Sequence, residues 1–166
     1  MAGMVNQLID VMNEQVERHK ELHGLSLEEK DAIIKNDIET LQKLVNLKNM
    51  VISQNNRLEK QRISLVADIA EVLGLKGQEL DLAALVDLLD GQVEQAGLRE
   101  VGKRLKEIVT ELKEVNDINK ELLETAIDFV EYSLNALRST LMPEPAEYPL
   151  KGQSGDDGKG TFNATR

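Results

Sequence analysis

The stretch GLREVGKRLKEIVTELKEVNDINKELLETAIDF, residues 97–129, decides the fold. An unbroken repeat of three and four residues runs along it, apolar or small at every position except Asn119: Leu98, Val101, Leu105, Ile108, Leu112, Val115, Asn119, Leu122, Ala126 and Phe129. This spacing keeps the side chains on one helix face and is typical of helices in bundles and coiled coils. The pattern continues to Leu137 or Leu141, and Pro143 then ends it. We therefore expect one long helix from about Gly97 to that point.

The chain before this helix has the same character. Residues 1–142 contain no proline, and the first aromatic residue is Phe129. We expect a first helix over residues 4–35. Gly24 is costly inside a helix, and Ser26 with Glu29 could form a capping box that breaks it there. We nevertheless expect the helix to be continuous.

Asn36-Asp37 is the clearest boundary, because Asn tolerates the left-handed conformation after a helix and Asp is a strong N-cap. So short a break predicts an antiparallel hairpin with a second helix over residues 38–73. The expected packing positions of this second helix are Leu44, Leu47, Val51, Gln54, Leu58, Gln61, Leu65 and Val72.

A short helix follows the hairpin. Gly74 and Gly77 should end the second helix, and Asp81 should cap LAALVDLLD, residues 82–90, which stops at Gly91. The sequence thus predicts an all-α, elongated, antiparallel bundle of three long helices and one short one. We expect a helical domain over 1–141 and a flexible tail rich in Pro and Gly over 142–166.

Composition argues against several functions. The net charge of −10 and pI of about 4.8 disfavour nucleic acid and anionic membranes. The sequence has no cysteine, no apolar run that could span a bilayer, and no secretory signal in MAGMVNQLIDVMNEQ. We therefore expect a cytoplasmic protein without a membrane span.

No motif predicts catalysis, a cofactor or a metal site. His19 and His23 have a helical spacing that can hold zinc, but no third ligand accompanies them. Residues 155–160, GDDGKG, do not match a phosphate loop, because Gly follows the lysine and no strand precedes them. We expect neither enzymatic activity nor a bound metal or cofactor.

The last helix is apolar over more than one face near its end. Beside the regular repeat lies a second set of apolar side chains: Ile118, Leu123, Ile127, Val130 and Leu134. Such a helix is either buried on both sides, in a bundle or a dimer, or offers one side to a partner. Asn116 and Asn119 are expected to fix the register of packing or to hydrogen-bond a backbone group.

Several segments resemble the FlgN family of flagellar export chaperones. They are Leu8-Ile9-Asp10 at the start of a long acidic helix, residues 34–41 (IKNDIETL) at the turn, and residues 115–132, which contain VNDINKELL and IDFVEY. Tyr148 near Gly152 resembles the tail that often follows in this family. The resemblance covers most of the chain.

The resemblance implies a cytosolic chaperone that binds the C-terminal helical segment of hook-associated proteins, which form the hook–filament junction. It would prevent their premature assembly and deliver them to the flagellar type III export gate. The expected client-facing residues are Ile118, Asn119, Leu122, Leu123, Ile127, Val130 and Leu134. Tyr148 is the expected contact for the gate. The alternative is a structural coiled-coil protein that only self-associates, and a homodimer is compatible with either function.

Overall fold

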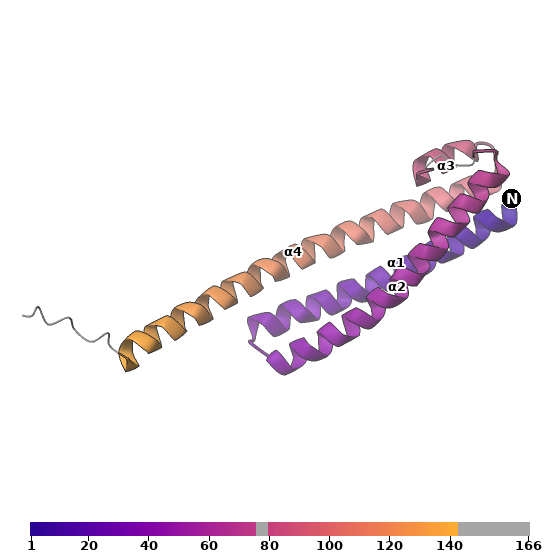
Figure 1. The fold of residues 1–166 in the computed structure, drawn as a ribbon. Helices are drawn as coiled ribbons and strands as arrows, with labels where there is room; N and C mark the ends of the chain where they lie inside the picture. Colours follow the sequence, from indigo (N-terminus) through magenta and orange to yellow (C-terminus); the bar gives the residue numbers. More distant parts are fainter. Residues whose placement is uncertain (76–79, 143–166) are drawn as a thin grey trace, which may run out of the picture. The chain divides into compact units, whose positions relative to one another are not determined.

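The computed structural model describes residues 1–75 and 80–142. This part of the chain is all-α, as predicted, with four helices: α1 (Ala2–Ile34), α2 (Ile38–Val72), α3 (Leu82–Leu88) and α4 (Val93–Leu141) (Figure 1). Met1–Ile127 form one compact unit and Asp128–Arg166 a second. The predicted tail and Tyr148 lie outside the described residues, apart from Met142.

The first hairpin is built as its sequence predicts. α1 is continuous through Gly24, and Asn36 takes the left-handed conformation with φ 55°. Asp37 caps α2: the Thr40 N–H donates to Asp37 Oδ1 at 3.1 Å, and the Thr40 hydroxyl donates to Oδ2 at 2.7 Å. Both hydrogen bonds stabilise the ionised carboxylate and therefore lower the pKa of Asp37.

The alternative considered for Ser26, a capping box that breaks the helix, is absent. Ser26 is buried in the middle of α1, and its hydroxyl donates across to Asn116 Oδ1 of α4 at 3.0 Å. The predicted continuous helix is confirmed, and the packing of α4 on this turn gives the serine hydroxyl a partner without ending α1.

α4 begins at Val93, four residues earlier than predicted, because two glycines inside it serve close packing rather than a helix end. A Cβ at Gly97 would lie 3.2 Å from Ile9 Cδ1 of α1. One at Gly102 would lie 2.7 Å from Leu82 Cδ2 of α3. The glycines thus allow α1 and α3 to approach the backbone of α4 closely.

Half of the predicted packing positions of α2 are wrong. Leu44, Val51 and Leu58 are buried and Leu65 is half-buried, as expected. The remaining predicted positions, Leu47, Gln54, Gln61 and Val72, are exposed. Their places are taken by the residues one position further along, which are half-buried: Lys48, Asn55, Arg62 and Leu73.

Lysine and arginine are accepted at two of these positions, 48 and 62, because carboxylates meet them. Lys48 Nζ donates to Glu29 Oε2 of α1 at 2.6 Å, and Arg62 makes two hydrogen bonds to Glu59, at 2.6 and 2.9 Å. Glu59 in turn accepts from Gln15 Nε2 of α1 at 2.8 Å. Contacts of Gln15 with Glu59 and of Glu29 with Lys48 show that α1 and α2 are antiparallel.

α4 runs parallel to α1 through the first unit. Arg104 donates to Asn13 at 2.7 Å, and Asn119 donates to the Ser26 carbonyl at 2.8 Å, so residue numbers rise together along the pair. The connection through α3 makes this direction possible, because it returns the chain to the end of the hairpin where α1 begins (Figure 1).

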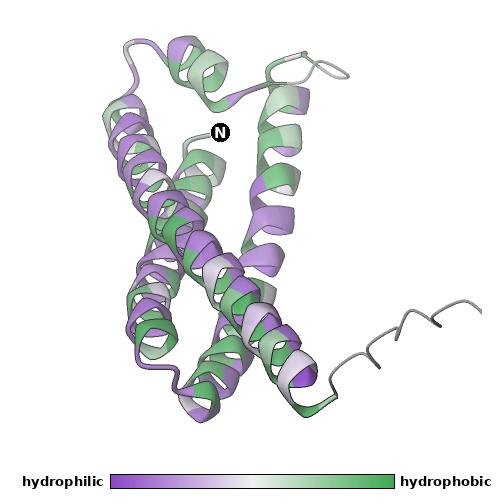
Figure 2. Cartoon of the chain, turned by 90° about the vertical axis from the view of Figure 1, so that its left-hand side faces the viewer, coloured by the Kyte–Doolittle hydropathy of each residue, from purple (hydrophilic) through white to green (hydrophobic). Residues whose placement is uncertain are grey.

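The core of the first unit lies where α3 joins the three long helices. Its buried members are aliphatic side chains and one methionine: Val5, Leu8, Met12, Val16, Ile69, Leu85, Val86, Leu89, Leu98 and Val101. Along the rest of the helices, hydrophobic and hydrophilic residues alternate around each axis (Figure 2). This end of the first unit therefore holds the beginning of α4 in place.

Candidate functional site

The repeat that predicted α4 packs inward along its first half. Leu98, Val101 and Ile108 are buried, and Leu105, Leu112 and Val115 are half-buried between them. The last buried position is Asn119, which is 4% exposed. Up to this point α1 covers the repeat, as the contacts to Asn13 and Ser26 show.

A polar cluster marks the end of the covered part. Asn119 Nδ2 donates to the Ser26 carbonyl at 2.8 Å and to Glu29 Oε2 at 3.1 Å. Glu29 is itself 9% exposed and accepts from Lys48 Nζ. One carboxylate oxygen thus joins α1, α2 and α4. Because buried polar groups are costly without partners, this cluster specifies how the three helices align.

Beyond Asn119 most of the apolar side chains of α4 are exposed. Leu122 is half-buried, whereas Ile127 is 56% exposed and Leu141 is 71% exposed. α4 is one continuous helix from Val93 to Leu141, so helical periodicity alone decides which side chains share a face. We call the following set the exposed stripe: Leu122, Leu123, Ile127, Val130, Leu134, Leu137 and Leu141.

Most of the predicted client-facing residues belong to accessible surface. Ile118, Leu123, Ile127, Val130 and Leu134 are exposed, and Leu122 is half-buried. Asn119 differs from this expectation, because it is buried and its amide is bonded to α1. It matches instead the other role considered for it, a polar residue of the packing repeat that hydrogen-bonds a backbone. We omit Asn119 from the candidate surface.

Four exposed residues were missing from the predicted site. Leu137 and Leu141 extend the stripe, Phe129, at 69% exposed, lies beside it, and Tyr132, at 73% exposed, lies on the opposite face of the helix. The repeat of three and four residues continues to Leu137 and Leu141 in the sequence, and this would have been enough to include both leucines in the predicted site. The aromatic residues carried a signal too, because aromatic side chains are enriched in binding interfaces.

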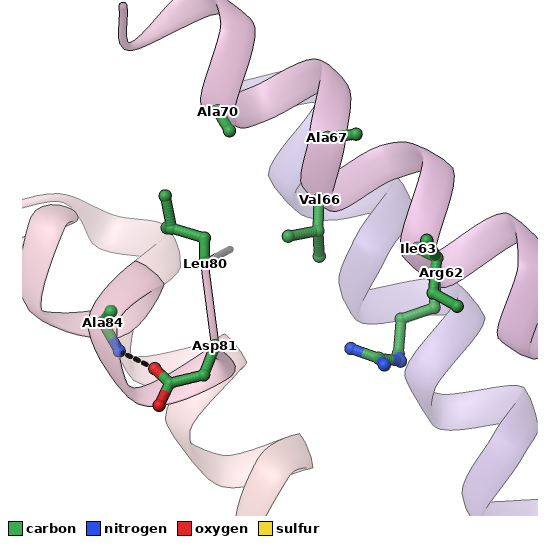
Figure 3. A pocket seen from close by; sticks show the side chains of 8 residues that line it. All are labelled: Arg62, Ile63, Val66, Ala67, Ala70, Leu80, Asp81 and Ala84. Atoms are coloured by element: carbon green, nitrogen blue, oxygen red, sulfur yellow. Dashed lines mark hydrogen bonds between the residues drawn. The ribbon is translucent and has the colours of Figure 1, made fainter. Parts of the chain in front are cut away.

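A hollow of about 650 Å³ lies between α2 and the start of α3 (Figure 3). Aliphatic side chains form most of its wall, with Arg62 and Asp81 as its charged groups. Both are engaged: Arg62 pairs with Glu59, which raises the pKa of the guanidinium, and Asp81 accepts the Ala84 N–H at 2.7 Å. The hollow therefore offers little to orient a small polar ligand.

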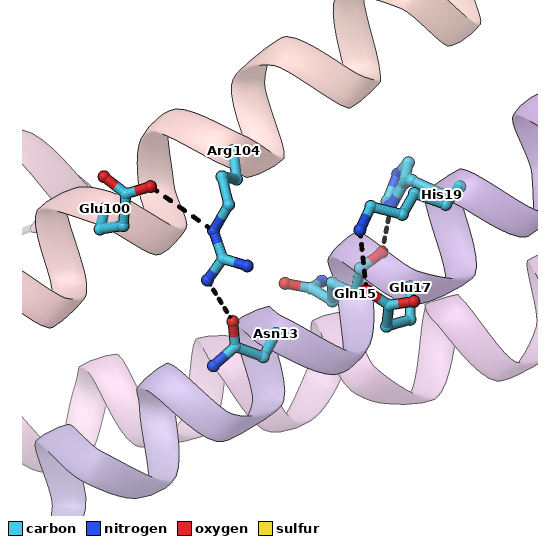
Figure 4. Close-up of polar contacts among 7 residues, drawn as sticks. Asn13, Gln15, Glu17, His19, Glu100 and Arg104 are labelled. Atoms are coloured by element: carbon cyan, nitrogen blue, oxygen red, sulfur yellow. Dashed lines mark hydrogen bonds and ion pairs between the residues drawn. The ribbon is translucent and has the colours of Figure 1, made fainter.

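His19 takes part in a local contact of α1. His19 Nδ1 lies 2.7 Å from the Gln15 carbonyl oxygen, near the Arg104–Asn13 contact to α4 (Figure 4). Over residues 1–75 and 80–142, no three His, Cys, Asp or Glu side chains are grouped as metal ligands would be. The helices described there also lack a segment long and apolar enough to cross a membrane.

The fold and the exposed stripe define an all-α helical protein whose longest helix has an uncovered apolar face. The model of the family described as FlgN protein matches residues 1–155. The chain therefore belongs to the FlgN family of flagellar export chaperones. No curated protein and no solved structure matches it.

Proposed function

We propose that this protein is a cytosolic export chaperone for hook-associated proteins, and that its exposed stripe binds the C-terminal helical segment of such a client. The observation that carries the proposal is the loss of cover along a single face of α4 after Asn119. Contiguous exposed apolar surface is rare on monomeric proteins and marks interaction sites.

The upstream half of α4 supports a helical partner. Between Leu98 and Asn119 the same helix face receives α1, side by side and parallel, with side chains spaced by three and four residues. A client helix with apolar residues at the same spacing can pack on the exposed stripe in the same manner. A client helix packed on the exposed stripe would bury its own apolar face there, which would delay the assembly of the client.

Calorimetry of the full chain against the C-terminal helical segments of hook–filament junction proteins from the same organism tests the proposal. We expect saturable one-to-one binding. The double variant Leu123→Asp/Ile127→Asp should abolish it and leave the circular dichroism of the helices unchanged, because both side chains are exposed. Met50→Asp, at an exposed apolar position of α2, is the control and should bind normally.

Self-association is the second candidate function, and the same stripe favours it. A structural coiled-coil protein would form a stable dimer through α4 and bind none of the segments. Light scattering that shows a tight dimer, lost in Leu123→Asp/Ile127→Asp, together with no binding in calorimetry, would replace the chaperone proposal by this one.

Delivery to the export gate is the remaining part of the proposal, and it rests on the family resemblance at Tyr148. A Tyr148→Ala variant should bind its client with unchanged affinity but fail to support its export. Unimpaired export of hook-associated proteins by cells carrying this variant would remove Tyr148 from the proposed gate contact.

A further inference from the structure

We infer that the helix bound by the exposed stripe is a basic amphipathic one, with Lys or Arg beside its apolar residues. This inference rests on the proposed function and adds the chemistry of the client. It follows from what borders the exposed stripe on each side.

The two borders of the stripe differ in character. A helix turns about 100° per residue, so Phe129 and Glu131 project to opposite sides of Val130. On the side of Glu131 lie two more acids, spaced by four and three residues: Glu124 and Asp128. We call these three residues the acidic border. The other side holds Ala126, Phe129, Ser133 and Ala136, none of which is charged.

The charge of the acidic border is balanced only at its two ends, where Lys120 and Arg138 lie on the same side of the helix. Residues 121–137 contain four acids and no lysine or arginine. Lys120 Nζ lies 4.0 Å from Glu124 Oε1, and both side chains are largely exposed, so this contact neutralises little. Within the described residues, no lysine or arginine forms an ion pair with Asp128 or Glu131.

A second copy of the chain fits this pattern poorly. In an antiparallel pair of stripes, equivalent borders face each other, so Glu131 of one copy would lie near Glu131 of the other at the middle of the stripe, while Glu124 would lie near Arg138. In a parallel pair, opposite borders meet, and the carboxylates would be set against the uncharged side of Ala126, Phe129 and Ser133. The first arrangement leaves Glu131 against a like charge, and the second removes carboxylates from water without a partner. A helix with basic residues at its border has neither cost.

Two synthetic helical peptides with the same Leu and Ile positions, one bordered by Lys and the other by Glu, would test this on the full chain. Each exposed ion pair contributes modestly, so two or three together should favour the Lys peptide about tenfold at low salt. The preference should shrink toward equality in 0.5 M NaCl, because salt screens exposed charges.

The variant Asp128→Lys/Glu131→Lys should reverse the preference for the two peptides. Asp10→Lys/Glu14→Lys changes the net charge equally at two exposed positions of α1 and should retain the wild-type preference. Equal affinities of the wild-type chain for both peptides, within twofold, would overturn the inference. So would a charge-reversed variant that still prefers the Lys peptide.

The outcomes separate this inference from the proposed function. Hook–filament junction segments that bind wild-type protein and Asp128→Lys/Glu131→Lys equally, but not Leu123→Asp/Ile127→Asp, would refute the basic helix and leave the chaperone proposal intact. If the junction segments do not bind but the Lys peptide is preferred tenfold, the basic-helix inference is supported and hook-associated proteins are refuted as the clients. A dimer detected by light scattering and lost in Leu123→Asp/Ile127→Asp would make a second copy the occupant and overturn the inference.

Discussion

Replacing Asn119 by alanine tests whether the polar cluster aligns the three long helices. The substitution removes the hydrogen bond to the Ser26 carbonyl and the one to Glu29 Oε2. A neutral hydrogen bond contributes about 1 kcal/mol and one to a charged group about 2 kcal/mol, a loss of about 3 kcal/mol. Glu29 keeps Lys48 as its partner and so avoids the larger penalty of an isolated buried charge.

Two effects offset part of this loss. Alanine favours helix over asparagine by about 0.5 kcal/mol. It also removes Asn119 Oδ1, a buried oxygen that accepts no hydrogen bond from the described residues. We therefore expect Asn119→Ala to lower the free energy of unfolding by about 2 kcal/mol, and the melting temperature by about 4–8 °C for a chain of this size.

Urea denaturation followed by circular dichroism measures the change. The control is Asn135→Ala, the same substitution at an exposed position of α4, which should leave stability unchanged or raise it slightly. Peptide binding by the folded fraction of Asn119→Ala should be unaffected, because the side chain is not on the candidate surface. A loss of stability below about 0.5 kcal/mol would refute the role given to the cluster.

Three further substitutions test other contacts. Gly24→Ala should raise stability by about 1 kcal/mol in urea denaturation, since a Cβ there meets nothing within 4 Å. Gly102→Ala should be at least about 1 kcal/mol less stable than Gly24→Ala, because its Cβ would overlap Leu82; equal stabilities would contradict the close approach. Glu59→Gln should cost less than about 1 kcal/mol at pH 7, because the pair is partly exposed. Hydrogen bonds from Arg62 chiefly lower the pKa of Glu59, so this contribution is fully present above the pKa of glutamate in the unfolded chain and disappears as pH falls through the lower native pKa. Denaturation of wild type and Glu59→Gln should therefore converge in acid, and a difference that persists well below pH 4 would refute the ion pair as its source.

Neighbouring residues determined which segments are helical and most of the helix ends, the start of α4 at Val93 being the exception. The repeat of three and four residues predicts α4, Asn36-Asp37 predicts the turn, and Asp81 predicts the start of α3; the structure has all three. These features are local, because a cap or a left-handed turn depends on groups within a few residues of each other.

Tertiary packing decided which side chains are covered. The sequence of α2 allows either Leu47 or Lys48 in the packing repeat, and Glu29 on α1 selects the lysine. Ser26 joins α1 to α4 instead of ending a helix, and Asn119 is buried where a client contact was expected. At 1.5 Å per residue α1 is about 50 Å long and α4 about 74 Å, yet their repeats look alike in the sequence. Burial at any position depends on whether another helix lies against it, and only the tertiary structure shows that α1 covers the repeat of α4 as far as Asn119.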